Sequence, residues 1–226
     1  MLNDQSGHFE IEQKNGVIHI NSKFYSLESD KQERIISAAF KEFAQNGYEK
    51  ASTNEIIKEA EISKGSLFSY FTSKKGLYLF LLDYVVEIIE KIYEEINYNE
   101  TDFFNRMRDI GLIKFKIMKK FPQAFDFLMT AANEDAKEVK SEIEKIQKHA
   151  IESGFQRGYK NIDWTKFRDD IDLQKTMNII NWTLLSFSEQ QRSRLNSFEG
   201  MSTEVLEEWE AYFDIMKRCF YKEDEN

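Results

Sequence analysis

Residues 52–75, STNEIIKEAEISKGSLFSYFTSKK, constrain the fold of this chain more than any other stretch. Ser52 followed by Glu55 matches a capping box, in which the serine oxygen accepts from a helical N–H and the glutamate accepts from the serine N–H. Ser63 suits the N-cap of a second short helix, and residues 61–62 between the two helices suit a tight turn. The stretch therefore predicts a helix-turn-helix.

The second of these helices, expected at residues 64–71, has an apolar side and a polar side. Leu67 and Phe71 are four residues apart, so they share the side that packs on the first helix. The other side is small and polar, and its N-terminal half is where a recognition helix meets base edges in the major groove. A third helix beginning near residues 73–75 adds ammonium groups and a helix N-terminus, which suit a phosphate oxygen.

Residues 34–82 resemble the N-terminal DNA-binding domain of the TetR family of repressors. The resemblance is carried by Phe40 and Phe43, Asn46-Gly47-Tyr48, Thr53, Ile56, Ala60, Ser63-Lys64-Gly65, Leu67, Tyr70-Phe71, Lys74 and Leu77. Phe68 stands where family members usually have tyrosine, so it offers a thymine methyl an apolar contact and offers a phosphate no hydroxyl. The residues predicted to contact DNA are Thr53, Asn54, Ser63, Lys64, Gly65, Ser66, Phe68, Ser69, Tyr70 and Lys74.

Composition agrees with a helical DNA-binding protein. One proline and nine glycines in 226 residues favour long helices and an all-α fold. The net charge is −9, but residues 31–75 contain eight Lys or Arg and six Glu, which gives this segment a charge of +2. The sequence contains neither a long apolar run nor a basic N-terminus followed by one, so we expect a cytoplasmic protein without membrane contact.

The sequence offers no catalytic or metal site. Cys219 is the only cysteine, and His8, His19 and His149 have no metal-ligand spacing. A Gly-rich phosphate loop after a strand, a GxSxG elbow and an HExxH motif are all missing. We therefore expect neither an enzyme nor a bound cofactor or metal.

Residues 1–29 precede the part that resembles the family. Apolar and polar residues alternate on both sides of Asn15-Gly16, a pair typical of two-residue hairpin turns. A β-hairpin over residues 8–21 is one expectation. An unfolded segment is the alternative, because an isolated hairpin is marginally stable.

The rest of the chain predicts a second helical domain. Its expected parts are a long helix from residue 74, a helix after Thr101-Asp102, a restart at Pro122, a charged helix from Asn133 to about Tyr159, and two long terminal helices. This gives about nine helices in three segments: an N-terminal extension at 1–29, a DNA-binding domain at 30–75, and an effector-binding and dimerisation domain at 76–226.

The resemblance implies roles for the second domain, since TetR-like proteins pair their last two long helices in a dimer and bind a small effector. The residues predicted at the dimer interface are Ile180, Leu184, Phe187, Trp209, Phe213 and Met216; packing within one monomer is the alternative. The residues predicted to line an effector pocket are Phe104, Phe125, Met129, Asn181 and Trp182; ordinary core packing, or for Asn181 a dimer-interface hydrogen bond, is the alternative.

We therefore expect an all-α, homodimeric, TetR-like transcriptional regulator that binds a pseudo-palindromic DNA operator. As a repressor, it would be released by a small apolar or amphipathic effector that shifts the dimer between two geometries. The alternative is a helical ligand sensor or protein-binding adaptor that keeps the helix-turn-helix only as a scaffold.

Overall fold

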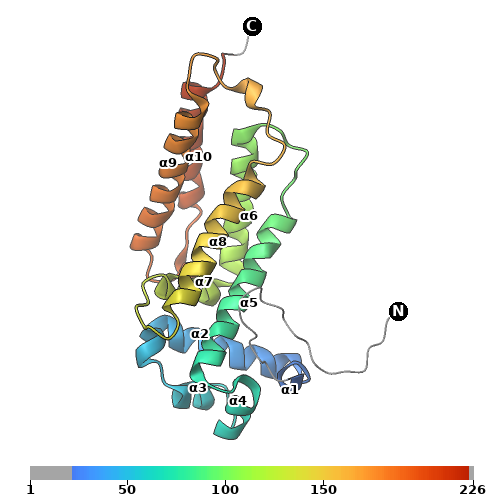
Figure 1. The fold of residues 1–226 in the computed structure, drawn as a ribbon, viewed down its shortest axis with the longest axis vertical. Coiled ribbons are helices and arrows are strands. Elements are labelled where there is room, and N and C mark those ends of the chain that lie inside the picture. Colours follow the sequence, from blue (N-terminus) through green and yellow to red (C-terminus); the bar gives the residue numbers. More distant parts are fainter. Residues whose placement is uncertain (1–21, 224–226) are drawn as a thin grey trace, which may run out of the picture. The chain divides into compact units, whose positions relative to one another are not determined.

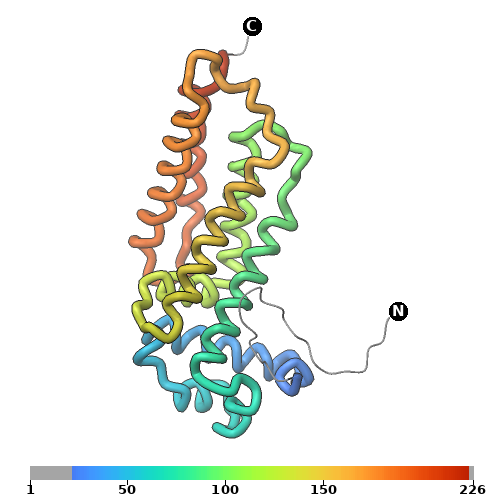
Figure 2. The backbone as a smooth tube through the Cα atoms, in the orientation of Figure 1, coloured from blue at the N-terminus to red at the C-terminus, as the bar shows by residue number. Residues whose placement is uncertain are grey.

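The computed structural model describes residues 22–223, which form ten α-helices and two short 3-10 turns (Figures 1 and 2). The α-helices are α1 Ser22–Tyr25, α2 Ser29–Lys50, α3 Thr53–Glu59, α4 Lys64–Phe71, α5 Lys74–Glu94, α6 Phe103–Lys120, α7 Pro122–Ala131, α8 Lys140–Gly158, α9 Leu173–Arg194 and α10 Glu204–Phe220. The 3-10 turns are η1 Trp164–Lys166 and η2 Phe198–Gly200. The predicted all-α fold is confirmed, and the hairpin predicted at residues 8–21 lies outside the described residues.

The described chain forms two compact units. Unit 1 contains residues 22–87 and 123–148, and unit 2 contains residues 88–122 and 149–223. Helices α5 and α8 therefore contribute residues to both units. The boundary predicted at residue 75 separates a DNA-binding domain from an effector-binding domain. It is a division by function, and it stays a prediction.

Unit 1 joins the helix-turn-helix to α7 and the loop that follows it. Gly47 interrupts α2 with a φ of 65°, a conformation that only glycine adopts without strain, and a Cβ there would lie 2.9 Å from Glu134 Oε2. The Tyr48 N–H donates to that same oxygen at 2.5 Å, and the Tyr48 hydroxyl donates to Glu138. Thr130 Oγ1 adds a hydrogen bond to the Ala44 carbonyl at 2.7 Å. The loop after α7 thereby fixes the end of α2.

Two predicted helix starts are wrong. Helix α8 begins at Lys140 instead of Asn133, because residues 133–139 form turns in which Glu134 accepts from Tyr48 and from the Ala136 N–H. The sequence predicted Ser29 or Asp30 as the N-cap of the first long helix, but α2 begins directly after Glu28 and both residues lie inside it. The predicted start at Pro122 is confirmed in α7.

Unit 2 is built around α6, whose N-terminus is held by two buried polar residues. Asp102 caps the helix by accepting from the Asn105 N–H at 3.0 Å, and Lys166 Nζ lies 3.0 Å from its other oxygen. Arg106 is fully buried and donates to the carbonyls of Lys160 and Glu100. Apolar side chains of α6, α9 and α10 fill the core beyond. Within residues 22–223, no helix is both long and apolar enough to span a membrane.

Candidate DNA-binding surface

Side-chain hydrogen bonds cap the N-termini of both helices of the motif. The Ser52 side chain accepts from the Glu55 N–H at 3.4 Å, and Ser63 accepts from the Ser66 N–H at 3.1 Å. The other half of the predicted capping box is wrong, because the Ser52 N–H donates to Glu42 Oε1 at 2.8 Å. A residue of α2 therefore takes the place that Glu55 was expected to fill.

A tight turn joins α3 to α4. Glu61 has a φ of 54°, and the Ile62 N–H donates to the Ile57 carbonyl at 3.1 Å. Leu67 and Phe71 are buried as the apolar spacing predicted. The turn and this packing leave the N-terminal end of α4 on the surface.

The exposed end of α4 carries Ser63, Lys64 and Gly65. Lys64 forms no ion pair with any residue in the described part of the chain. A Cβ added at Gly65 would find Ser63 Oγ as its nearest neighbour, at 3.9 Å, so another molecule can approach the backbone here. This group, Ser63 to Gly65, is the reading edge. Four other residues predicted to contact DNA are partly buried: Thr53, Ser66, Phe68 and Ser69. Asn54, also predicted to contact DNA, is exposed at the start of α3.

Two of the predicted DNA-contacting residues are placed otherwise than expected. Tyr70 is only 8 % exposed, because its ring packs against Phe24 at a centroid distance of 6.0 Å, so the expectation that it projects beside Lys64 is wrong. Lys74 already has an acceptor, since its Nζ lies 3.1 Å from the Glu49 carbonyl and 5.0 Å from the centre of the Tyr48 ring.

Sequence reasoning missed Phe24, which braces α4 from the N-terminal extension. Its side chain is 1 % exposed and lies 4.9 Å from the ring of Phe71 and 5.3 Å from that of Phe80. The only hint in the sequence was an aromatic pair, Phe24-Tyr25, shortly before the first long helix.

The residues predicted to line an effector pocket do not form one group. Phe125 and Met129 belong to unit 1, whereas Phe104, Asn181 and Trp182 belong to unit 2. Trp182 is 67 % exposed, so the monomer does not enclose its side chain, and its place in an effector pocket stays a prediction. Asn181 accepts a hydrogen bond from the Tyr159 hydroxyl of the same chain, so its side-chain oxygen already has a partner within unit 2.

Half of the residues predicted at the dimer interface lie inside the monomer. Ile180, Phe213 and Met216 are buried in the core of unit 2, where α9 and α10 pack with α6. Leu184 and Trp209 are partly buried against that core, and the partly buried Phe187 packs on Trp209 with ring centres 5.2 Å apart. The exposed apolar residues of these two helices are Leu173, Ile179, Trp182, Leu185, Tyr212 and Ile215.

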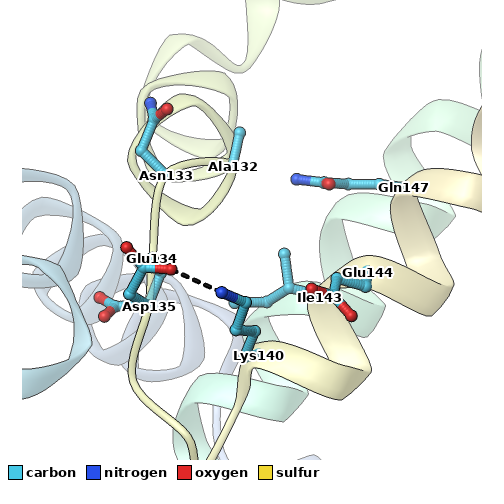
Figure 3. A pocket seen from close by; sticks show the side chains of 8 residues that line it. All are labelled: Ala132, Asn133, Glu134, Asp135, Lys140, Ile143, Glu144 and Gln147. Carbon is cyan, nitrogen blue, oxygen red and sulfur yellow. Dashed lines mark hydrogen bonds and ion pairs between the residues drawn. The ribbon is translucent and has the colours of Figure 1, made fainter.

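A shallow depression of about 370 Å³ lies between the end of α7 and the start of α8 (Figure 3). Its lining is mostly polar, with Glu134, Asp135, Lys140 and Glu144 around Ile143. Lys140 is itself paired with Asp135 at 2.7 Å. This depression differs in chemistry from the apolar cavity that an effector was expected to need.

Known proteins match this chain most strongly over the helix-turn-helix. The model of the bacterial regulatory proteins of the tetR family matches residues 35–80. The HTH-type transcriptional regulator YuxN of Bacillus subtilis is 49 % identical over 55 residues, which are 24 % of this chain and 19 % of YuxN. The regulator YdgC of the same organism is 25 % identical over 152 residues, 64 % of this chain and 72 % of YdgC.

The likeness in fold extends along nearly the whole chain. A solved TetR family transcriptional regulator from Chloroflexus aurantiacus superimposes with a TM-score of 0.60 at 22 % identity, covering 90 % of this chain and 99 % of that one. The helix-turn-helix, the match to residues 35–80 and this shared fold lead to one conclusion: the chain contains a DNA-binding domain of the tetR family of bacterial regulatory proteins and has the fold of solved TetR family regulators.

Proposed function

We propose that this protein is a sequence-specific transcriptional repressor, which binds a pseudo-palindromic operator as a homodimer and leaves it when a small molecule binds. The observation that carries the proposal is the reading edge at the start of α4. An unpaired ammonium, small hydroxyls and an unobstructed backbone lie together there, as base readout with close phosphate contact requires.

The dimer would form on the exposed side of α9 and α10. Ile179, Trp182 and Leu185 follow one another at three-residue spacing on α9, and Tyr212 and Ile215 do so on α10, so each helix presents an apolar stripe. Stripes of this size on exposed helices mark protein interfaces. Two copies related by a two-fold axis would form a four-helix bundle and present two reading edges to one duplex.

The test is selection of bound fragments from random duplex DNA, followed by footprinting and titration of the selected site at several salt concentrations. Lys64→Ala should weaken binding to the selected site, while Lys137→Ala, an exposed lysine of the loop after α7, should leave binding unchanged. Failure to enrich any sequence would contradict the proposal. If both variants bound the selected DNA with equal affinity, the reading edge would not be the surface that contacts DNA.

A further inference from the structure

Helix α4 has one large apolar side chain that the protein does not bury. Leu67, Tyr70 and Phe71 are buried, whereas Phe68 is only partly buried. Every other aromatic residue between residues 22 and 87 has an aromatic ring beside it, but Phe68 has none among the described residues. A single apolar residue on a surface needs no explanation by itself. The position of Phe68 on α4 is what gives it a role.

Phe68 lies on the same side of α4 as Lys64, the charged residue of the reading edge. Residues four apart are neighbours on one side of a helix, and these two positions are about 6 Å apart along the helix axis. Gly65 and Ser69, also four apart, form the next row, and neither has a bulky side chain. Along this row the backbone of α4 can enter a groove of DNA deeply, which brings the side chains of Lys64 and Phe68 to the edges of the bases.

The chemistry of the Phe68 side chain decides which base it can recognise. A phenyl ring has no hydrogen-bond donor or acceptor, so it cannot read the polar edges of guanine, adenine or cytosine. Thymine differs, because it presents a C5 methyl group in the major groove, and apolar side chains recognise this group. The hydroxyls of the neighbouring serines can bond to several bases and therefore do not select thymine.

We propose that Phe68 is a specificity-determining residue, and that it contacts the C5 methyl group of one thymine in each half of the operator. This rests on the proposed function, because it takes α4 to lie in the major groove. Lys64 gives the approximate place of that thymine. Successive base pairs are about 3.4 Å apart, so the thymine should lie about two base pairs from the base or phosphate that Lys64 contacts.

The test replaces thymine by uracil, which removes only the C5 methyl group. An operator is first selected from random duplex DNA with the unmodified full chain, and each thymine of one half-site is then replaced in turn. Fluorescence anisotropy measures the affinity for each duplex. Replacement of one particular thymine should weaken binding about fourfold, the effect expected for one buried methyl group.

Variants of the protein assign this loss to Phe68. Phe68→Ala should bind the thymine and uracil operators with equal affinity. Phe68→Leu, which keeps a large apolar side chain, should still prefer the thymine operator. The matched control is Phe115→Ala, which removes a partly buried phenylalanine of α6 and should keep the fourfold preference. Each preference is a ratio of two affinities of one protein, so incomplete folding of a variant does not change it.

Two results would overturn the inference. In the first, the unmodified protein binds every uracil operator as tightly as the thymine operator. In the second, Phe68→Ala keeps the fourfold preference, which would assign the methyl contact to another residue. The selection step keeps this inference apart from the proposed function. If no sequence is enriched, the proposed function fails; if an operator is enriched but either of these two results is found, only the role of Phe68 fails.

Discussion

The centre of the Phe24 ring lies 4.9 Å from the centre of the Phe71 ring, and Phe71 is the last residue of α4. Phe24 belongs to the N-terminal extension, outside the segment that the family model matches. A residue of this chain's own extension thus supports the helix that carries the reading edge. Helix α1 therefore belongs to unit 1 and packs against α4.

Phe24→Ala should lower the free energy of unfolding by about 3 kcal/mol, because it removes a fully buried aromatic side chain and leaves a cavity beside α4. It should also weaken operator binding, since α4 loses its support. Urea unfolding and a DNA titration measure the two effects. Tyr25→Ala is the matched control, as this neighbouring aromatic residue is exposed and should change stability by less than about 1 kcal/mol.

Gly65→Ala should change stability and DNA binding in opposite directions. Alanine is a better helix former than glycine by about 1 kcal/mol, and its Cβ would make only an ordinary contact here, with Ser63 Oγ at 3.9 Å, so the free protein should become more stable. The same methyl group should obstruct close approach of a phosphate and weaken operator binding. Gly200→Ala, where the Cβ meets nothing within 4 Å, should leave DNA binding unchanged. A Gly65→Ala protein with full operator affinity would show that DNA does not approach this backbone.

Glu61→Gly should stabilise the protein by about 0.5–1 kcal/mol, because a φ of 54° strains every residue with a Cβ. Chemical denaturation of the free protein measures the gain. The contrasting variant is Glu55→Gly, which places glycine inside α3 at an exposed position and should destabilise by about 1 kcal/mol. If both changes destabilised the protein, the contacts of the Glu61 side chain would contribute more stability than its positive φ costs.

Asp102 makes the stability of unit 2 depend on acid pH. Burial alone would raise the pKa of this carboxyl, but the Asn105 N–H and the ammonium groups of Lys166 and Lys217 outweigh burial and hold the pKa below its ordinary value. The stabilisation is therefore complete above the unfolded pKa of about 3.9 and is lost as pH falls through the lower, folded pKa.

Asp102→Asn should cost about 1–2 kcal/mol at neutral pH, because it removes the charge that these donors face. The difference from the unmodified protein should shrink as the carboxyl is protonated in acid. Urea unfolding over a series of pH values checks this. Asp109→Asn, an exposed acid of the same helix, should show no such dependence, and a constant difference for Asp102→Asn at all pH values would contradict the assignment.

The helix-turn-helix was predictable because its determinants are local. The caps Ser52 and Ser63 and the Leu67–Phe71 spacing each act within a few residues, and the structure has them as expected. The burial of Tyr70 was not predictable from the same stretch, because it depends on Phe24, which is 46 positions earlier in the chain. Local patterns define a helix and its polar side, but distant residues decide which polar-capable side chains remain exposed.

In the second domain, sequence patterns likewise failed to show which helix faces are covered by other helices of the same chain. The stripes that contain Ile180 and Phe213 were predicted to meet a partner subunit, but these two residues fill the core of unit 2. Spacing along a helix shows which side chains share a side, but it does not show whether that side packs within the monomer or against a second copy.

Trp182→Glu should convert the proposed dimer into a monomer, because it would place two charges in the apolar centre of the proposed α9–α10 interface. The subunit itself should keep its stability, since this side chain is already exposed in the monomer. Sedimentation equilibrium gives the mass, and an operator titration should show weaker binding, because a monomer presents one reading edge instead of two. Leu112→Glu, an exposed leucine on α6, is the matched control and should leave the mass unchanged. A Trp182→Glu protein that remains a dimer would place the interface elsewhere.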